Sequence, residues 1–212
     1  MEEAAPVRVA EEAKDATIST PHIASVGLRR ARRDDDSPFA ALAFLDAGPG
    51  CGCWGPRPSD VLRRRCAAFI ARSPWIFNEE VLGQAPASYA AWLSKVQLNK
   101  HRCGEAELVA LSETLNLEIA VWSTLFDGGA PLLYKPRQPT LRAHLLFSGA
   151  HYDLIVAREV NGAVRTTFPI ANGESDRAIR LRVSAAVRRW RKANGDCYWA
   201  HANDARHPPL LS

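Results

Sequence analysis

The sequence predicts an α+β domain, with a helical lobe packed on a short, mainly antiparallel sheet. Apolar residues recur at helical spacing from position 37 to position 115, and four short strand-like runs follow between positions 117 and 157. Asn161-Gly162, shortly after the last run, is a strong signal for a tight hairpin turn. Helices first and clustered strands afterwards favour an α+β fold over alternating strand–helix units.

The first helix is expected over residues 37–45. Ser37 is a good N-cap residue, Pro38 suits the first helical turn, and Gly48-Pro49 stops the helix. A turn-rich segment, residues 48–58, lies between this helix and the next.

Three further helices are expected before the strands. One begins after Ser59, one spans residues 88–97 and one spans residues 104–115. In each, the apolar side chains fall on one helical face, which we expect to be buried. Tyr89 and Trp92 belong to such a face, so we interpret them as core residues rather than as a binding platform.

The strand-like runs are short and bounded by Gly and Pro. They cover residues 117–122, 132–134, 144–147 and 152–157. The Asn161-Gly162 turn predicts that residues 152–158 pair with residues 164–168.

A basic helix is expected over residues 175–192, with seven Lys or Arg against one Asp. Its apolar side chains recur on one face, at Ile179, Val183, Val187 and Trp190. Clustered Arg suits nucleic acid or an anionic membrane, but we favour a helix that packs this face on the domain and turns its Arg residues to water. We therefore expect no nucleic-acid partner.

Length and composition favour one domain with tails. The chain has 212 residues and a formal net charge of +4. We divide it into a flexible extension (1–24), the domain itself (25–170) and a basic helix with its tail (171–212). No apolar stretch approaches the ~18 residues that span a bilayer, and no secretory leader is evident. Five Cys without framework spacing favour a reducing compartment, so we expect a cytoplasmic protein.

The stretch His151-Tyr152-Asp153 is the most informative local feature. A His at the mouth of a strand and an Asp two positions later lie on the same face of that strand. The carboxylate can then hold one imidazole nitrogen and leave the other to act as a base. The alternative is an ordinary turn with a surface His.

A second feature is the acidic run Asp34-Asp35-Asp36 before Ser37. Carboxylates complement the positive dipole at a helix N-terminus. A side chain at position 37 would project at that terminus, where a thiol has a lowered pKa and an oxyanion is stabilised. The alternative is a plain N-cap behind a solvated acidic run.

In order, these features resemble the ovarian-tumour (OTU) family of cysteine proteases, which remove ubiquitin. The family's nucleophile motif is Asp-Gly-x-Cys-(Leu/Phe)-(Phe/Tyr)-x-Ala-Leu, and residues 34–42 here are Asp-Asp-Asp-Ser-Pro-Phe-Ala-Ala-Leu. The family's middle motif is Trp-Gly-x-x-x-Glu-Leu-x-Ala-Leu followed by Ile-x-Val. Here residues 103–111 read Cys-Gly-Glu-Ala-Glu-Leu-Val-Ala-Leu, with Cys103 in place of the Trp, and residues 119–121 read Ile-Ala-Val. Its closing motif, His-(Tyr/Trp)-(Asp/Asn), is matched by residues 151–153.

The main departure from the family is Ser37 at the nucleophile position. A hydroxyl ionises far less readily than a thiol, so we expect this sequence to be inactive. We favour a deliberate Cys-to-Ser replacement as the explanation. A natural pseudoenzyme that still binds ubiquitin is a second, and a nucleophile at Cys51 or Cys53 is a third. Against the third, the glycines around these two thiols begin a helix poorly.

The resemblance implies a mechanism without metal or cofactor. A thiolate at position 37, deprotonated by His151, would attack the carbonyl of the C-terminal glycine of ubiquitin or a ubiquitin-like protein, while Asp153 orients His151. Backbone N–H groups of residues 35–37 would stabilise the oxyanion, and Asp34 would shape their loop. Glu105 and Glu107 are weak candidates for binding the basic ubiquitin tail. The simpler interpretation is that they are acidic residues in the first turn of a helix.

Other function classes remain as alternatives. One is a non-catalytic ubiquitin-binding module, and another is a viral polyprotein-processing protease with the same fold. The Arg- and Ala-rich composition hints at a pathogen or viral source, in which case the cytoplasm would be that of a host. Cys51-Gly52-Cys53 lacks the second ligand pair of a structural zinc site, so no metal is expected.

Overall fold

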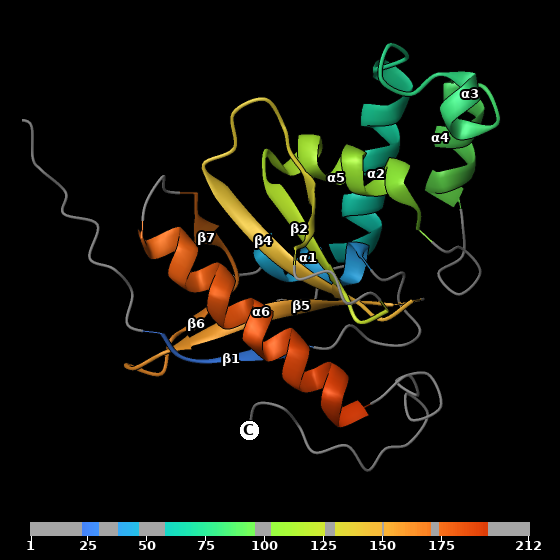
Figure 1. Cartoon of the computed structure of the whole chain (residues 1–212). Helices are drawn as coiled ribbons and strands as arrows, with labels where there is room; N and C mark the ends of the chain where they lie inside the picture. The colour runs from blue at the N-terminus through green and yellow to red at the C-terminus, as the bar shows by residue number, and fades with distance from the viewer. Residues whose placement is uncertain are drawn as a thin grey trace, which may run out of the picture.

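The computed structural model describes residues 23–29, 38–46, 58–95, 103–125, 130–149, 151–170 and 174–194. Within them the chain runs through helices and strands in the order β1(Ile23–Arg29), α1(Phe39–Asp46), α2(Pro58–Arg72), α3(Glu79–Leu82), α4(Pro86–Lys95), α5(Glu105–Leu115), β2(Glu118–Ser123), β3(Leu132–Tyr134), β4(Leu141–Phe147), β5(Tyr152–Glu159), β6(Val164–Arg165), β7(Phe168–Pro169) and α6(Glu174–Asn194) (Figure 1).

The seven described strands form one sheet. Its main path is β1-β5-β4-β2-β3, while β6 pairs with β5 and β7 pairs with β4. Of the pairings in the described residues, only β2 with β4 is parallel. The predicted α+β class and its mainly antiparallel sheet are therefore confirmed.

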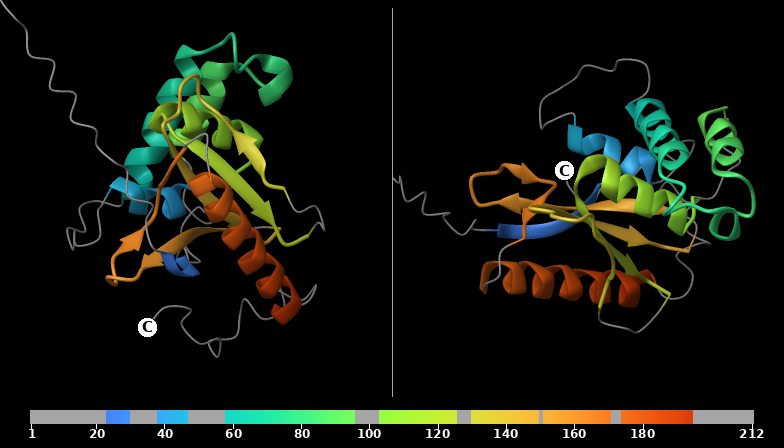
Figure 2. Two further views of the ribbon diagram at one scale, coloured as in Figure 1. Left: turned by 60° about the vertical axis from the view of Figure 1, so that its left-hand side comes forward. Right: turned by 90° about the horizontal axis from the view of Figure 1, so that it is seen from above.

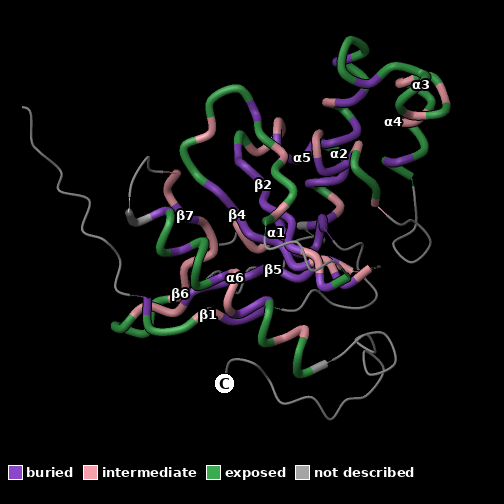
Figure 3. Tube along the Cα trace, viewed as in Figure 1, coloured by how far each residue is buried: buried purple, intermediate pink, exposed green. Residues whose placement is uncertain are grey.

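Helices cover both faces of the sheet (Figure 2). On the helical-lobe face, residues of α1, α2, α4 and α5 share one core cluster with Ile119, Val121, Leu145 and Leu154 of the central strands. On the α6 face, side chains of α6 form a second cluster with residues of the strands. Successive side chains of a strand point to opposite faces of the sheet, so the central strands contribute residues to both clusters. Buried segments concentrate in β2, β4 and β5, whereas α3 is largely exposed (Figure 3).

The predicted buried helix faces are confirmed in outline. Leu62, Cys66 and Ile70 of α2 lie in the first cluster, and Leu93 of α4 is fully buried. Trp92, which the same periodicity placed in the core, is 41% exposed. The buried face of α4 carries Ala90 and Leu93, and α4 packs on α2.

The α6 helix packs on the sheet through the predicted stripe: Ile179, Val183 and Val187 are buried in the second cluster and Trp190 packs against it. Buried ion pairs join the same interface. Arg142 of β4 donates to Glu118 of β2 and, at 2.5 Å, to Asp176 of α6. The helix that the prediction assigned to a separate C-terminal segment thus shares a core with the sheet.

Two elements were not predicted. β1 contains Gly27 and a register shift between Ile23 and Ser25, and these break the alternation by which a strand is recognised. The α3 helix has four residues, too few for a periodic pattern, although both its caps are signalled in the sequence. Asn78 Oδ1 accepts a 2.9 Å hydrogen bond from Val81 N–H, and Gly83 has a φ of 69°.

The hairpin at Asn161-Gly162 is confirmed, but its second strand is shorter than predicted. Ala157 and Arg158 pair with Arg165 and Val164. The chain then leaves β5, and Phe168 pairs instead with Arg142 of β4. In the part of the chain that the structure describes, no helix is long and apolar enough to cross a membrane.

Candidate active site

His151 is the last residue of the turn that joins β4 to β5, and it is half-buried. The backbone N–H of Ser148 donates to the carbonyl oxygen of His151 at 3.0 Å, and the Ser148 hydroxyl donates to the same oxygen at 3.3 Å. Gly149 has a φ of 98°, a conformation that favours glycine. Sequence reasoning missed the role of Ser148, because a serine in a turn has several carbonyls within reach and no pattern says which one it binds.

Asp153 is the second residue of β5 and is buried, opposite Leu146 of β4. It has the same parity along the strand as Ile155 and Ala157, which lie in the α6-face cluster. Its side chain therefore belongs to the α6 side of the sheet. The structure thus brings His151 and Asp153 to the start of one strand, as the motif predicts.

Tyr152, between these two residues, has a packing role on the opposite face. It is buried in the helical-lobe cluster, and its ring lies 4.7 Å from that of Phe147, centroid to centroid. Burial raises the pKa of its hydroxyl, with further contributions from Tyr134 and nearby acidic groups, so this side chain stays neutral.

Ser37 and Asp34, the other predicted catalytic positions, lie outside the described residues. The residues directly after position 37 are described. Pro38 is buried, and its carbonyl accepts a 2.9 Å hydrogen bond from Leu42 N–H, so α1 begins two residues after the predicted start. α1 shares the helical-lobe cluster with Tyr152 and other residues of β5.

β1 also ends near the start of β5. Its last residue, Arg29, pairs with Leu154. The Arg29 guanidinium lies 4.0 Å from the ring centroid of Phe44 in α1. β1 precedes the predicted nucleophile position in the chain and α1 follows it. Both therefore contact β5, the strand that begins just after His151.

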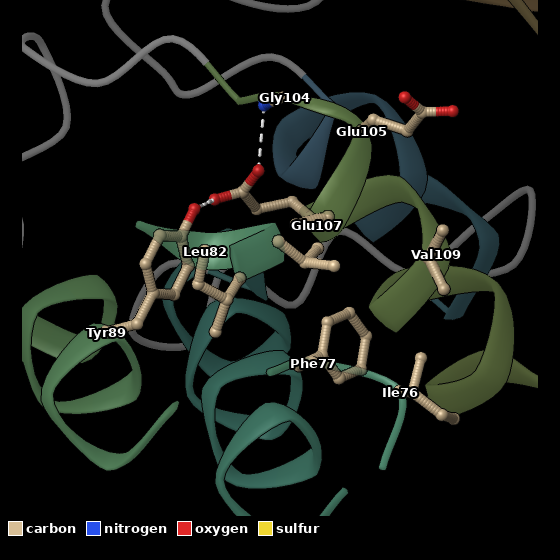
Figure 4. Close-up of a pocket in the computed structure, with 10 residues that line it drawn as sticks. Ile76, Phe77, Leu82, Tyr89, Gly104, Glu105, Glu107 and Val109 are labelled. Carbon is tan, nitrogen blue, oxygen red and sulfur yellow. Dashed lines mark hydrogen bonds between the residues drawn. The ribbon is translucent and has the colours of Figure 1, made fainter. Parts of the chain in front are cut away.

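The two candidate substrate-binding glutamates have different surroundings (Figure 4). Glu107 is buried and its carboxylate accepts hydrogen bonds from Tyr89 Oη and, at 2.7 Å, from the backbone N–H of Gly104. The acid therefore holds the first turn of α5. Glu105 is exposed, and its carboxylate points away from that of Glu107. Of this pair, only Glu105 has an exposed side chain.

These residues border a pocket of about 450 Å³ between the 76–77 segment, α3, α4 and the start of α5. Its lining is mostly apolar, with Ile76, Phe77, Leu82 and Val109 around the Tyr89–Glu107 pair (Figure 4). Val81, which also lines the pocket, is 60% exposed, and Trp75, which precedes Ile76 in the chain, is 77% exposed. Exposed apolar side chains grouped around a pocket are typical of a surface that binds another protein.

Of the two thiols that the structure describes, Cys66 is unsuited to act as a nucleophile. Burial, and secondarily Glu107, raises the pKa of the Cys66 thiol, which therefore stays protonated. Cys103 is half-buried beside the first turn of α5. Cys51 and Cys53 lie outside the described residues. Across the described ranges, no group of three His, Cys, Asp or Glu side chains is arranged to hold a metal ion.

Known proteins resemble this chain in sequence and in structure. No family model matches the chain. Two curated relatives are ubiquitin thioesterase OTU1 of Dictyostelium discoideum, 34% identical over 97 residues, and ubiquitin thioesterase Otu1 of Drosophila melanogaster, 31% identical over 113 residues. The matches cover 44% and 53% of this chain but only 28% and 31% of those proteins, so the chain spans less than a third of their length.

A solved ovarian tumour (OTU) domain in complex with ubiquitin superposes with a TM-score of 0.63, at 19% identity, over 83% of this chain and 95% of that chain. The fold is therefore that of an OTU domain. Together with the two relatives found by sequence, this match confirms the resemblance to the OTU family that the three ordered motifs predicted.

Proposed function

We propose that this chain is a deubiquitinase domain of the OTU type, which hydrolyses the peptide or isopeptide bond after the C-terminal glycine of ubiquitin or a ubiquitin-like protein. The observation that carries the proposal is the placement of His151 and Asp153 at the start of β5, within an OTU fold and next to the elements that flank position 37. Relatives named as ubiquitin thioesterases support the same activity.

In the proposed mechanism, His151 takes the proton of the group at position 37, and Asp153 orients the imidazole and stabilises its charged form. The nucleophile attacks the carbonyl carbon of the substrate's last glycine. Backbone N–H groups of residues 35–37 stabilise the oxyanion, and Asp34 shapes the loop that presents them. Collapse of the tetrahedral intermediate releases the amine as His151 returns the proton, and water then hydrolyses the acyl-enzyme.

We further propose that the sequence as it stands is an inactive form. At neutral pH a thiol of pKa ~8.5 forms an appreciable thiolate beside an imidazole, whereas the hydroxyl of Ser37 does not. Ubiquitin binding does not require the nucleophile, so the Ser37 protein should still bind its substrate. Two exposed apolar side chains support a protein as the partner: Val81, which lines the pocket, and Trp75, which precedes the lining residue Ile76.

The direct test is Ser37→Cys, assayed with ubiquitin that carries a fluorogenic group on its C-terminal carboxyl. We expect hydrolysis from Ser37→Cys and none above background from the original chain or from Ser37→Ala. Adding His151→Ala to Ser37→Cys should lower kcat by about 10²- to 10⁴-fold, the usual contribution of a general base.

Two outcomes would change the assignment. A folded Ser37→Cys protein that binds ubiquitin but does not turn over would favour the ubiquitin-binding pseudoenzyme, for which Ser37 itself is the supporting observation. Hydrolysis by the original chain that is lost on Cys51→Ala or Cys53→Ala would instead identify one of these thiols as the nucleophile.

A further inference from the structure

The turn that carries His151 is held by two hydrogen bonds to one oxygen. Both the backbone N–H and the hydroxyl of Ser148 donate to the carbonyl of His151, at 3.0 and 3.3 Å. Ser148 is only 1% exposed. Water therefore does not compete for its hydroxyl, and the bond to His151 is available at all times.

The carbonyl of Phe147, the residue before Ser148, also accepts two hydrogen bonds from a single residue. The backbone N–H and the hydroxyl of Thr124, just after β2, both donate to the carbonyl of Phe147, at 3.1 and 3.5 Å. Phe147 also pairs with Tyr152 and packs its ring on it. The residues on both sides of the turn are thus fixed, and Gly149-Ala150 alone separate Ser148 from His151.

The His151 carbonyl shares a rigid peptide plane with the Cα that carries the imidazole. This oxygen lies in the peptide plane between His151 and Tyr152, and that plane is already set on its far side by the pairing of Tyr152. Holding the oxygen therefore holds this plane and, with it, the Cα of His151 from which the side chain extends. A catalytic imidazole tolerates only small displacements, because a proton passes over a hydrogen-bond distance of about 2.6–3.2 Å.

We propose that Ser148 is a positioning residue for His151, acting through its hydroxyl bond to the His151 carbonyl. Ser148 contacts no reacting atom; it limits how far the backbone that carries the imidazole can be displaced. The inference rests on the proposed function, since it assigns His151 the role of general base.

The first arm of the test uses Ser37→Cys as the background and adds Ser148→Ala. We expect kcat for the fluorogenic ubiquitin substrate to fall about tenfold, with KM unchanged within twofold, because the imidazole is misdirected while ubiquitin binding is intact. Ser148→Thr keeps a hydroxyl and should recover most of the lost kcat.

The matched control is Ser112→Ala. Ser112 is also 1% exposed, and its hydroxyl also donates to a backbone carbonyl, that of Tyr134, at 3.0 Å. The two substitutions should lower stability to urea by similar amounts, yet only Ser148→Ala should lower kcat. Equal loss of kcat in both, or none in Ser148→Ala, would overturn the inference while leaving the proposed function in place.

The second arm needs no activity. Carbon-13 labelling of the histidine rings in the original chain allows the His151 ring resonance, assigned with His151→Gln, to be compared with and without Ser148→Ala. We expect that resonance to move or broaden, and the resonance of His144, on the central strand, to stay in place. If Ser37→Cys is inactive, the proposed function fails, and this arm alone decides whether Ser148 orients His151: an unchanged resonance would contradict it.

Discussion

The two faces of the sheet are stabilised in different ways. The helical-lobe face is a largely apolar core in which residues of α1, α2, α4 and α5 meet the central strands, and its buried charged groups, Arg63 and Glu107, belong to the helices. The α6 face also has an apolar cluster, but it adds charged and polar groups that are almost completely buried: Glu118, Arg142, His144 and Asp176.

This difference affects how precisely the helices on each face are positioned against the sheet. Apolar contacts are not directional, so helices on the helical-lobe face can adjust to one another. A buried ion pair has one favourable geometry. Arg142 bonds to Glu118 on the neighbouring strand and to Asp176 on the helix, and Arg180 lies 3.2 Å from Asp176. α6 is therefore held in one register on the sheet.

The largest effect is expected from breaking this arrangement with Arg142→Met. The substitution leaves the carboxylates of Glu118 and Asp176 buried without their shared partner. Removal of one member of a buried ion pair typically costs about 3–5 kcal/mol. Because Lys135 and Arg180 still approach these carboxylates, we expect a value near the lower end, about 3 kcal/mol, measured by urea unfolding.

The matched control is Arg165→Met. Arg165 Nη2 lies 2.5 Å from Glu159 Oε1, but both side chains are partly exposed. A pair of this kind contributes about 0–1 kcal/mol. Similar losses from the two substitutions would mean that the buried pairs do not distinguish the α6 face from the surface.

Some features of the two faces could be predicted from the sequence, and others could not. The helix faces and the α6 stripe were predictable, because apolar residues repeat at a spacing that specifies both the helix and its buried side. The ion pairs were not, because Glu118 and Arg142 are opposite each other only through the parallel register of β2 and β4. No local pattern contains that register.

The candidate site also has features that the sequence predicts and features that it does not. His151 and Asp153 could be identified because they are two positions apart in one motif at the start of a strand. The hydrogen bonds of Ser148, and the bond between Tyr89 and Glu107, depend on which groups the fold brings together. That position 37 faces His151 stays a prediction, since Ser37 lies outside the described residues.

A second, pH-dependent effect is expected from His144. Its Nδ1 accepts a 3.1 Å hydrogen bond from Trp122 Nε1, and its Nε2 has no partner among the described residues. Burial, with smaller contributions from Arg142 and Arg180, lowers the pKa of His144 to about 3. In the unfolded chain the pKa returns to about 6.5.

The unfolded chain therefore binds a proton that the folded protein does not, at any pH between these two values. Stability is fully present above pH ~6.5 and decreases as the pH falls towards 3, by on the order of a few kcal/mol. His144→Gln keeps an acceptor for Trp122 without this titration. We expect its urea stability to fall less steeply from pH 7 to pH 4, whereas parallel profiles would contradict the assignment.

The smallest effect is expected on the helical-lobe face, from Tyr89→Phe. Burial, and next the hydrogen bond to Glu107, raises the pKa of the Tyr89 hydroxyl, so it remains a donor at neutral pH. A hydrogen bond to a charged group contributes about 1.5–3 kcal/mol; because Tyr89 is half-buried, we expect a loss of about 1–2 kcal/mol. Urea unfolding measures the loss, and faster hydrogen exchange at the Gly104 amide locates it.

Tyr134→Phe is the control for this last substitution, because Tyr134 is also half-buried and no hydrogen bond between described residues involves its hydroxyl. We expect it to change stability by less than about 0.5 kcal/mol. If both substitutions have the same small effect, the Tyr89–Glu107 bond does not hold the start of α5, and the helical-lobe face is stabilised by apolar packing alone. If Tyr89→Phe costs as much as Arg142→Met, directional bonds matter equally on both faces, and the contrast between them does not hold.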